Sequence, residues 1–225
     1  MLLVFMRKIS FPSLQLALDV VDLNLAEYLA RECWIDDHIW IEVGTPLIKC
    51  VGVNAVKSLR RIIPEAIIFA DMKCIDVGFI EAELAFSSGA DLMSVLGVAS
   101  DATILEAIKA CKKYNGKIVV DLISTPNPLE RALEVQNLGV DMVCFHMGID
   151  TQRYLGISAY EGLIDYIRKA CKILNIPVAV AGGITLDKVK GLIDSGVEVI
   201  VVGSAITKSS NPKNATMNFL RELLG

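Results

Sequence analysis

The stretch "NLGVDMVCFH" (residues 137–146) runs from a helix-type segment through a glycine and an acidic residue into a short apolar run. Two further stretches, "SSGADLMSVLG" (87–97) and "DSGVEVIVVG" (194–203), follow the same order. Glycine supplies the left-handed conformation in which many helices end, and the acid then occupies the turn before a strand. The three copies therefore predict a chain that returns repeatedly from helix to strand.

Eight short apolar runs rich in β-branched residues alternate with amphipathic stretches, which is typical of successive βα units. The predicted strands are 14–18, 39–43, 66–70, 92–96, 117–121, 142–146, 177–181 and 199–203. The predicted helices are 24–33, 53–63, 78–88, 101–114, 128–138, 159–174, 186–194 and 214–224. Eight such units predict an α/β fold, a single (β/α)8 TIM barrel. No linker divides the sequence, so we expect one domain over residues 1–225, with residues 1–12 as a possible N-terminal extension.

The composition limits the setting in which this barrel works. The chain has 225 residues, 53% of them hydrophobic, and a net charge of −4, which suits one sizeable core. It has no basic run or basic helical face, so we expect neither nucleic acid nor a membrane as partner. The apolar opening lacks a signal-peptide pattern and is too short to span a bilayer. Six widely spaced cysteines without a C-x-x-C motif favour the reducing cytoplasm.

Ionisable residues gather where the predicted strands end. In barrels of this type the catalytic groups lie at the carboxyl ends of the strands, because the following loops converge on one mouth. A charge removed from water is costly without a partner, so the cluster predicts an active site. Taken singly, each acid is also compatible with a turn or a helix cap, and the set with a structural salt-bridge network. The residues are Asp19, Glu42, Asp71, Asp121 and His146, with Lys73 just past Asp71.

Two of these side chains have a predicted task. Asp71 and Lys73 lie two residues apart, so in an extended segment they point to the same side, and Lys73 can neutralise neighbouring carboxylates. His146 is the candidate proton shuttle, because the ordinary pKa of histidine lies near neutrality. The alternative for His146 is a histidine that belongs to the core.

Two glycine-rich turns follow the last two predicted strands, "AGGIT" (181–185) and "GSAIT" (203–207). Backbone N–H groups exposed by glycine can hold a dianion, and in barrels a phosphate site recurs at these two loops. We therefore predict a phosphate site at Gly182, Gly183, Gly203 and Ser204. Plain tight turns are the alternative.

The motifs together resemble a known family. They are "LALD" (16–19), "IEVGTPLI" (41–48), "ADMKCIDVG" (70–78), "GADLMSVLGVASDATI" (89–104), "FHMGIDTQ" (145–152), "VAVAGGI" (178–184) and "VVGSAIT" (201–207). This set is similar to that of the 3-hexulose-6-phosphate synthases, within the orotidine-monophosphate-decarboxylase group of barrels. The sister 3-keto-L-gulonate-6-phosphate decarboxylases typically have an arginine shortly after the histidine and a glutamate at the place of Asp121. "HMGIDTQ" and Asp121 thus favour the synthases.

The resemblance implies a lyase of the aldolase type. Such an enzyme reversibly joins formaldehyde to ribulose 5-phosphate, in the ribulose monophosphate pathway, and gives D-arabino-3-hexulose 6-phosphate through a metal-stabilised enediolate. The alternatives are 3-keto-L-gulonate-6-phosphate decarboxylation, epimerisation of a phosphosugar, and a phosphosugar-binding barrel without catalysis.

The resemblance also implies the roles of individual residues. Glu42 and Asp71 would hold Mg²⁺, with Mn²⁺ as the alternative, Lys73 would stabilise the enediolate, and Asp121 would hold a hydroxyl or a water. Asp19 and Asp76 would orient Lys73, and because the last aspartate of the motif reaches into the partner's site in this family, a homodimer is implied. A Schiff base on Lys73 is disfavoured, since an ammonium beside Asp71 and Asp76 stays protonated. Ser204 stands where the decarboxylases have arginine, which leaves the phosphate without a guanidinium.

Overall fold

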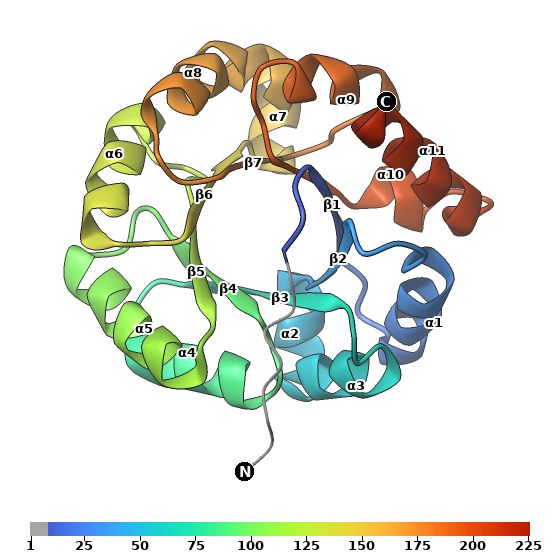
Figure 1. Ribbon diagram of the computed structural model, residues 1–225, viewed down its shortest axis with the longest axis horizontal. Helices are drawn as coiled ribbons and strands as arrows, with labels where there is room; N and C mark the ends of the chain where they lie inside the picture. Colours follow the sequence, from blue (N-terminus) through green and yellow to red (C-terminus); the bar gives the residue numbers. More distant parts are fainter. Residues whose placement is uncertain (1–8) are drawn as a thin grey trace.

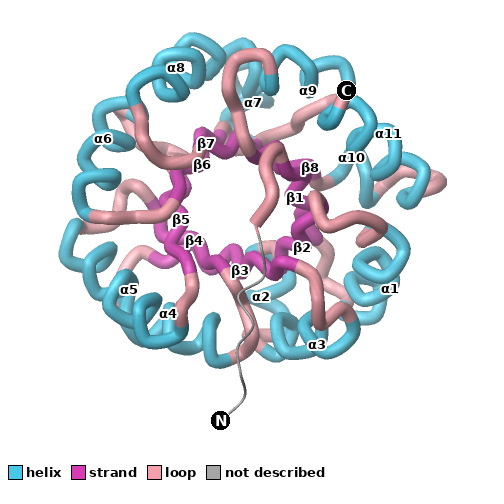
Figure 2. Tube along the Cα trace, viewed as in Figure 1, coloured by secondary structure: helices cyan, strands magenta, loops and turns pink. Residues whose placement is uncertain are grey.

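The eight strands close into one parallel barrel in chain order, and the helices form a ring around it (Figures 1 and 2). The computed structural model describes residues 9–225, so most of the predicted N-terminal extension lies outside the described part. The strands are β1 (Ser13–Leu18), β2 (Ile39–Val43), β3 (Ile67–Cys74), β4 (Leu92–Leu96), β5 (Lys117–Asp121), β6 (Met142–His146), β7 (Val178–Ala181) and β8 (Val199–Val202). The predicted TIM barrel is confirmed.

The helices follow the strands as expected, with additions at the carboxyl end of the barrel. They are α1 (Leu23–Cys33), α2 (Thr45–Val51), α3 (Asn54–Ile62), α4 (Gly78–Ser87), α5 (Asp101–Tyr114), α6 (Pro128–Leu138), α7 (Ile149–Leu155), α8 (Ala159–Ile173), α9 (Leu186–Ile193), α10 (Ser204–Thr207) and α11 (Pro212–Leu224). The short helices α2, α7 and α10 were not predicted. They have seven, seven and four residues, which is too short for an amphipathic pattern to stand out in the sequence. Within residues 9–225 no helix is both long and apolar enough to cross a membrane.

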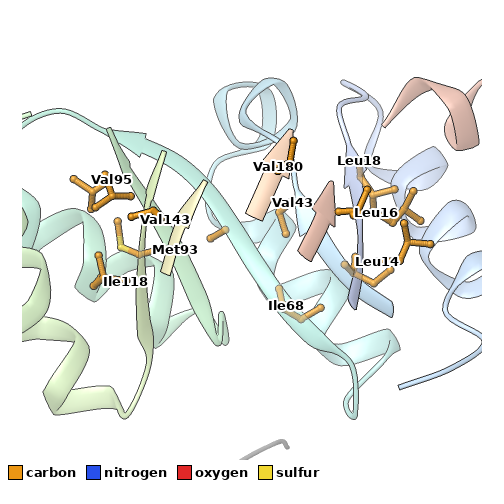
Figure 3. Close-up of a cluster of buried hydrophobic side chains, with 14 of the residues drawn as sticks. Leu14, Leu16, Leu18, Val43, Ile68, Met93, Val95, Ile118, Val143 and Val180 are labelled. Atoms are coloured by element: carbon orange, nitrogen blue, oxygen red, sulfur yellow. The ribbon is translucent and has the colours of Figure 1, made fainter. Parts of the chain in front are cut away.

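Side chains alternate along each strand between the two faces of the barrel wall. The outward side chains, such as Leu14, Leu16 and Leu18 of β1, pack against the helices in one large core (Figure 3). The inward ones form a second, smaller cluster that fills the barrel and includes Trp40 and Phe69. Toward the carboxyl ends of the strands, the inward positions change from apolar to polar, and the site begins there.

The acids of the three repeated stretches close the opposite end of the barrel. Each lies just before the start of a strand and accepts the backbone N–H near the start of the preceding strand, at 2.8 to 3.0 Å. Because a parallel strand begins with an N–H that lacks a partner on one side, the carboxylate supplies that partner. We call these three acids the amino rim: Asp91 bonds Ile68, Asp141 bonds Ile118, and Glu198 bonds Val178.

Candidate active site

Strand register brings the first three acids together at the carboxyl end of the barrel. Ala17 of β1 pairs with Glu42 of β2, and Glu42 pairs with Phe69 of β3. Asp19 and Asp71 each lie two residues beyond a partner of Glu42, so their strands point both side chains into the same mouth. We call the polar side chains at this mouth the carboxyl rim: Asp19, Glu42, Asp71, Lys73, Asp121 and His146.

Glu42 is the deepest acid of the carboxyl rim and is only 6% exposed. Its Oε2 accepts a hydrogen bond of 2.8 Å from the side-chain amide of Gln15, which lies on the inward face of β1. Burial, together with the negative charges of Asp71 and Asp19, raises the pKa of Glu42 well above its ordinary value. Asp19 is open to the mouth, and its pKa is also raised, by desolvation and then by the charge of Asp71.

Asp71 is 4% exposed and is held from three sides. Thr45 at the start of α2 donates its hydroxyl to Oδ2 at 2.6 Å, and Ser94 of β4 donates its hydroxyl to Oδ1 at 2.8 Å. The ammonium of Lys73 contacts both carboxylate oxygens, at 2.9 and 3.1 Å. These contacts fix the plane of the carboxylate, so its orientation does not depend on a ligand.

Lys73 is placed between two carboxylates. Its Nζ lies 2.9 Å from Oδ2 of Asp71 and 2.9 Å from Oδ2 of Asp121. Burial alone would lower the pKa of Lys73, but the two neighbouring carboxylates reverse that effect, and the pKa is raised strongly. Asp76 was expected to be one of the acids that orient Lys73. Within one chain the second carboxylate beside the ammonium is that of Asp121 instead. The ammonium stays protonated, which disfavours a Schiff base on this lysine.

Asp121 links Lys73 to His146. Its oxygens accept from the lysine ammonium, from the backbone N–H of Ile123 and from Nδ1 of His146 at 3.0 Å, and its expected contact with a hydroxyl or a water stays a prediction. Burial opposes ionisation, yet His146 and Lys73 outweigh it, so the pKa of Asp121 falls to about 2. Because an ionised carboxylate can only accept hydrogen bonds, Nδ1 of His146 carries the hydrogen of this contact, and Nε2 is the ring nitrogen that Asp121 does not engage.

Asp76 stands apart from the carboxyl rim within one chain. It is exposed, and its Oδ1 accepts the backbone N–H of Val77 at 2.8 Å. The segment around it also exposes apolar side chains, at Ile75, Val77 and Ile80. Within residues 9–225 its side chain has no hydrogen bond to a residue of the carboxyl rim, in contrast to Asp71.

The glycine-rich turns lie where they were predicted, directly after β7 and β8. Gly182 and Gly183 both adopt positive φ angles, of 111° and 64°. A Cβ at Gly182 would collide with the backbone oxygen of Met147, so only glycine fits there. Gly203 precedes Ser204, the first residue of α10, and a Cβ at Gly203 would lie 3.5 Å from Oδ2 of Asp19. The turn after β8 thus borders the carboxyl rim.

Strand β3 was expected to end at Ala70, but it continues to Cys74. Its charged residues Asp71 and Lys73 are part of the strand, since the pairing with β4 resumes at Cys74. They lie in a bulge between the paired residues Ala70 and Cys74. Lys73 adopts a positive φ of 46° within this bulge. The charges that follow an apolar run looked like a loop in the sequence, whereas two hydrogen bonds with Ser94 of β4, one donated by Lys73 and one accepted by Asp71, keep them in the sheet.

Three polar residues of the site were not identified from the sequence: Gln15, Thr45 and Ser94. Gln15 and Ser94 lie inside apolar strands, where one polar residue on the inward face is the signal. Thr45 follows the strand that ends in Glu42 and begins the unpredicted helix α2. Each donates to a carboxylate of the carboxyl rim.

The carboxyl rim offers a donor set that suits a divalent cation. Within residues 9–225 no group of three or more histidine, cysteine or acidic side chains is arranged to hold a metal ion. Glu42 and Asp71 still offer oxygen ligands only, and Mg²⁺ commonly takes one or two carboxylates and completes its shell with water and substrate oxygens. The buried Oε1 of Gln15, beside Glu42, has no hydrogen-bond donor among the described residues. This surplus of oxygen acceptors fits a hard cation.

Comparison with known proteins supports the resemblance seen in the motifs. The Orotidine 5'-phosphate decarboxylase / HUMPS family matches residues 12–219. A 3-hexulose-6-phosphate synthase from Mycobacterium gastri is 39% identical over 203 residues, which are 90% of this chain and 95% of that protein. The crystal structure of a 3-hexulose-6-phosphate synthase superimposes with a TM-score of 0.88 at 38% identity, covering 94% of this chain and 99% of the other.

The sister enzymes of the group are also similar in structure. KGPDC (3-keto-L-gulonate-6-phosphate decarboxylase) from Streptococcus mutans superimposes with a TM-score of 0.87 at 30% identity, covering 95% of this chain and 97% of the other. Of the three relatives, the two synthases share the larger fraction of identical residues with this chain. The predicted resemblance is therefore confirmed along nearly the whole chain.

Proposed function

This chain belongs to the orotidine 5'-phosphate decarboxylase / HUMPS family, and on that basis we propose that it is a 3-hexulose-6-phosphate synthase. It joins formaldehyde to ribulose 5-phosphate in a reversible aldol reaction. The identity of 38–39% to synthases, against 30% to the decarboxylase over a similar share of the chain, supports this choice. The single observation that carries the chemistry is the ammonium of Lys73 between Asp71 and Asp121, with His146 bonded to the same Asp121.

The reaction needs a base and a stabilised enediolate. We assign the base to Nε2 of His146, which removes a proton from carbon 1 of ribulose 5-phosphate. The electrons of that C–H bond form the enediolate across carbons 1 and 2, and the ammonium of Lys73 stabilises its charge. Carbon 1 then attacks formaldehyde, and the new alkoxide takes a proton from His146. Atoms and electrons balance without an oxidant or a reductant.

The phosphate turns suit these substrates. A cavity of about 130 Å³ lies between the loops after β5 and β6, and His146 is the carboxyl-rim residue that borders it. The turns at Gly182, Gly183, Gly203 and Ser204 would hold the phosphate with backbone N–H groups and one hydroxyl. Binding energy from the phosphate would then position carbon 1 for the base.

We propose that Glu42 and Asp71 hold a divalent cation, Mg²⁺ or Mn²⁺, at the sugar oxygens. When bound, such a cation supplies Lewis-acid stabilisation of the developing negative charge. Asp19 faces the same mouth and would orient the cationic groups.

The six cysteines lie within the described residues and are free, which supports a reducing cytoplasm for this enzyme.

We also propose that the enzyme works as a homodimer. The segment from Ile75 through α4 exposes Ile75, Val77, Ile80 and Leu84 around Asp76, and an apolar surface of this kind suits an interface between two copies. Asp76 of the partner subunit would complete the site. Mixing Lys73→Ala with Asp76→Ala chains tests this, because a mixed dimer regains one intact site. We expect about a quarter of the wild-type activity in the mixture; no recovery would exclude shared sites.

The reaction itself is tested by following loss of formaldehyde from a mixture with ribulose 5-phosphate. We expect formaldehyde loss that EDTA abolishes and Mg²⁺ restores. If EDTA has no effect and borohydride traps a reduced imine on Lys73, the metal proposal is wrong. If formaldehyde is not consumed, while 3-keto-L-gulonate 6-phosphate releases carbon dioxide, the chain is the sister decarboxylase.

A further inference from the structure

Ser94 is the one inward polar residue of β4, between Leu92 and Leu96. It is 1% exposed, and its hydroxyl contacts Asp71 of the carboxyl rim. A buried hydroxyl within an apolar strand is costly unless its hydrogen bonds are satisfied. The partners of this hydroxyl therefore explain why a serine is present.

The bulge in β3 lies directly opposite Ser94. Ala70 pairs with Met93 and Cys74 pairs with Val95, so residues 71–73 of β3 oppose Ser94 alone. A bulge of this kind removes backbone groups from the sheet ladder and leaves them in need of other partners. Lys73 in particular has a positive φ of 46°, a conformation that residues with side chains avoid.

One hydroxyl satisfies both needs of the bulge. Oγ of Ser94 accepts the backbone N–H of Lys73 at 2.8 Å and donates to Oδ1 of Asp71, also at 2.8 Å. The donor hydrogen and an acceptor lone pair of the hydroxyl are both used. Ser94 thus joins the backbone of the lysine to the carboxylate that its own ammonium contacts.

We propose that Ser94 is a positioning residue for the reaction: its hydroxyl holds the β3 bulge in the conformation that directs Nζ of Lys73 between Asp71 and Asp121. In a regular strand Lys73 would lie two residues farther along β3 than Asp71, roughly 6.5 Å toward the solvent. The bulge returns the lysine backbone toward β4, and the ammonium reaches both carboxylates at 2.9 Å. This inference rests on the proposed function, because it acts through Lys73.

The kinetic test compares Ser94→Ala, Ser94→Thr and the matched control Ser58→Ala. Ser58 on α3 is also a buried serine whose hydroxyl donates to a carboxylate, that of Glu27 on α1, in the helix ring outside the barrel. We expect Ser94→Ala to lower kcat about 100-fold while KM for ribulose 5-phosphate stays within about threefold, since displaced catalytic groups cost turnover rather than phosphate binding. Ser94→Thr retains the hydroxyl and should recover most of kcat. Ser58→Ala should keep wild-type kcat.

A second measurement does not depend on activity. Acylation of lysine amines, followed by peptide mass spectrometry, reports how freely Lys73 leaves its carboxylates. Ser94→Ala should raise the labelling rate of Lys73 several-fold, with Ser58→Ala unchanged. Unchanged labelling of Lys73 in Ser94→Ala would overturn the inference, whatever reaction the enzyme catalyses.

A double-mutant comparison separates positioning from general damage. On the Lys73→Ala background, Ser94→Ala should lower the residual activity no further, because the residue that it positions is absent. An equal loss on both backgrounds would overturn the inference. If the wild type consumes no formaldehyde, the proposed function fails, and the labelling result alone decides the role of Ser94.

Discussion

The two ends of this barrel use the same residue types for opposite purposes. Each acid of the amino rim accepts a backbone N–H of the neighbouring strand, so its charge stabilises the sheet. The acids of the carboxyl rim are held mainly by other side chains, and they crowd one another. In this barrel an acid at a strand start closes the fold, whereas an acid at a strand end is available for chemistry.

The charges of the two rims also differ: the acids of the amino rim are neutralised more completely than those of the carboxyl rim. Asp91 lies beside Arg60, and Asp141 beside Lys117, so two amino-rim acids have their own cations. In the carboxyl rim one ammonium serves both Asp71 and Asp121, while burial and like charge raise the pKa of Glu42. The burial of Glu42 among like charges lowers stability, whereas Lys73 stabilises Asp71 and Asp121, and its ammonium is also available to the developing charge of a substrate.

The largest expected effect is at His146. The variant His146→Ala removes the base and should lower kcat by about 10²- to 10⁴-fold. The change also removes the Nδ1 hydrogen bond to the buried carboxylate of Asp121, which keeps its contacts with Lys73 and Ile123, so we expect the free energy of unfolding to fall by about 1–2 kcal/mol. Steady-state kinetics and urea unfolding measure the two quantities. A variant with near-normal kcat would remove His146 from the mechanism.

A change in the amino rim should lower stability and leave turnover unchanged. Asp91→Ala leaves the N–H of Ile68 without its acceptor and Arg60 without this carboxylate. We expect the free energy of unfolding to fall by about 2–3 kcal/mol, since hydrogen bonds to charged groups contribute in this range. The kcat of the folded protein should stay at the wild-type value. A large fall in kcat without loss of stability would contradict the division between the rims.

The pH dependence of stability separates the rims further, with a smaller expected effect. The pKa of Asp121 is about 2 in the folded chain against an ordinary 3.8, so the unfolded chain binds more protons between these values. The contribution of Asp121, about 2 kcal/mol, is therefore present above about pH 4 and is lost as the pH falls toward about 2. Urea unfolding between about pH 2 and 5 should show this loss, and Asp121→Asn should lack it. An equal slope in both proteins would contradict the assignment.

Much of the fold and part of the site could be predicted because period and position carry the information. The alternation of apolar runs with amphipathic stretches predicts eight βα units, and charges at strand ends predict the carboxyl rim. Gln15 and Ser94 were missed because a polar residue in an apolar strand signals a buried partner, but only the strand register shows which residue that partner is. The pairing of Lys73 with Asp121 was missed for the same reason, since residues 48 positions apart meet only through the closed barrel.

Deuterium exchange without formaldehyde decides whether the carboxyl rim stabilises an enediolate. The enzyme is incubated with ribulose 5-phosphate in heavy water, and the hydrogens on carbon 1 are followed by NMR. We predict that the wild type incorporates deuterium at carbon 1 and that His146→Ala does not. Formaldehyde consumption by the wild type without any exchange at carbon 1 would contradict this role of the carboxyl rim.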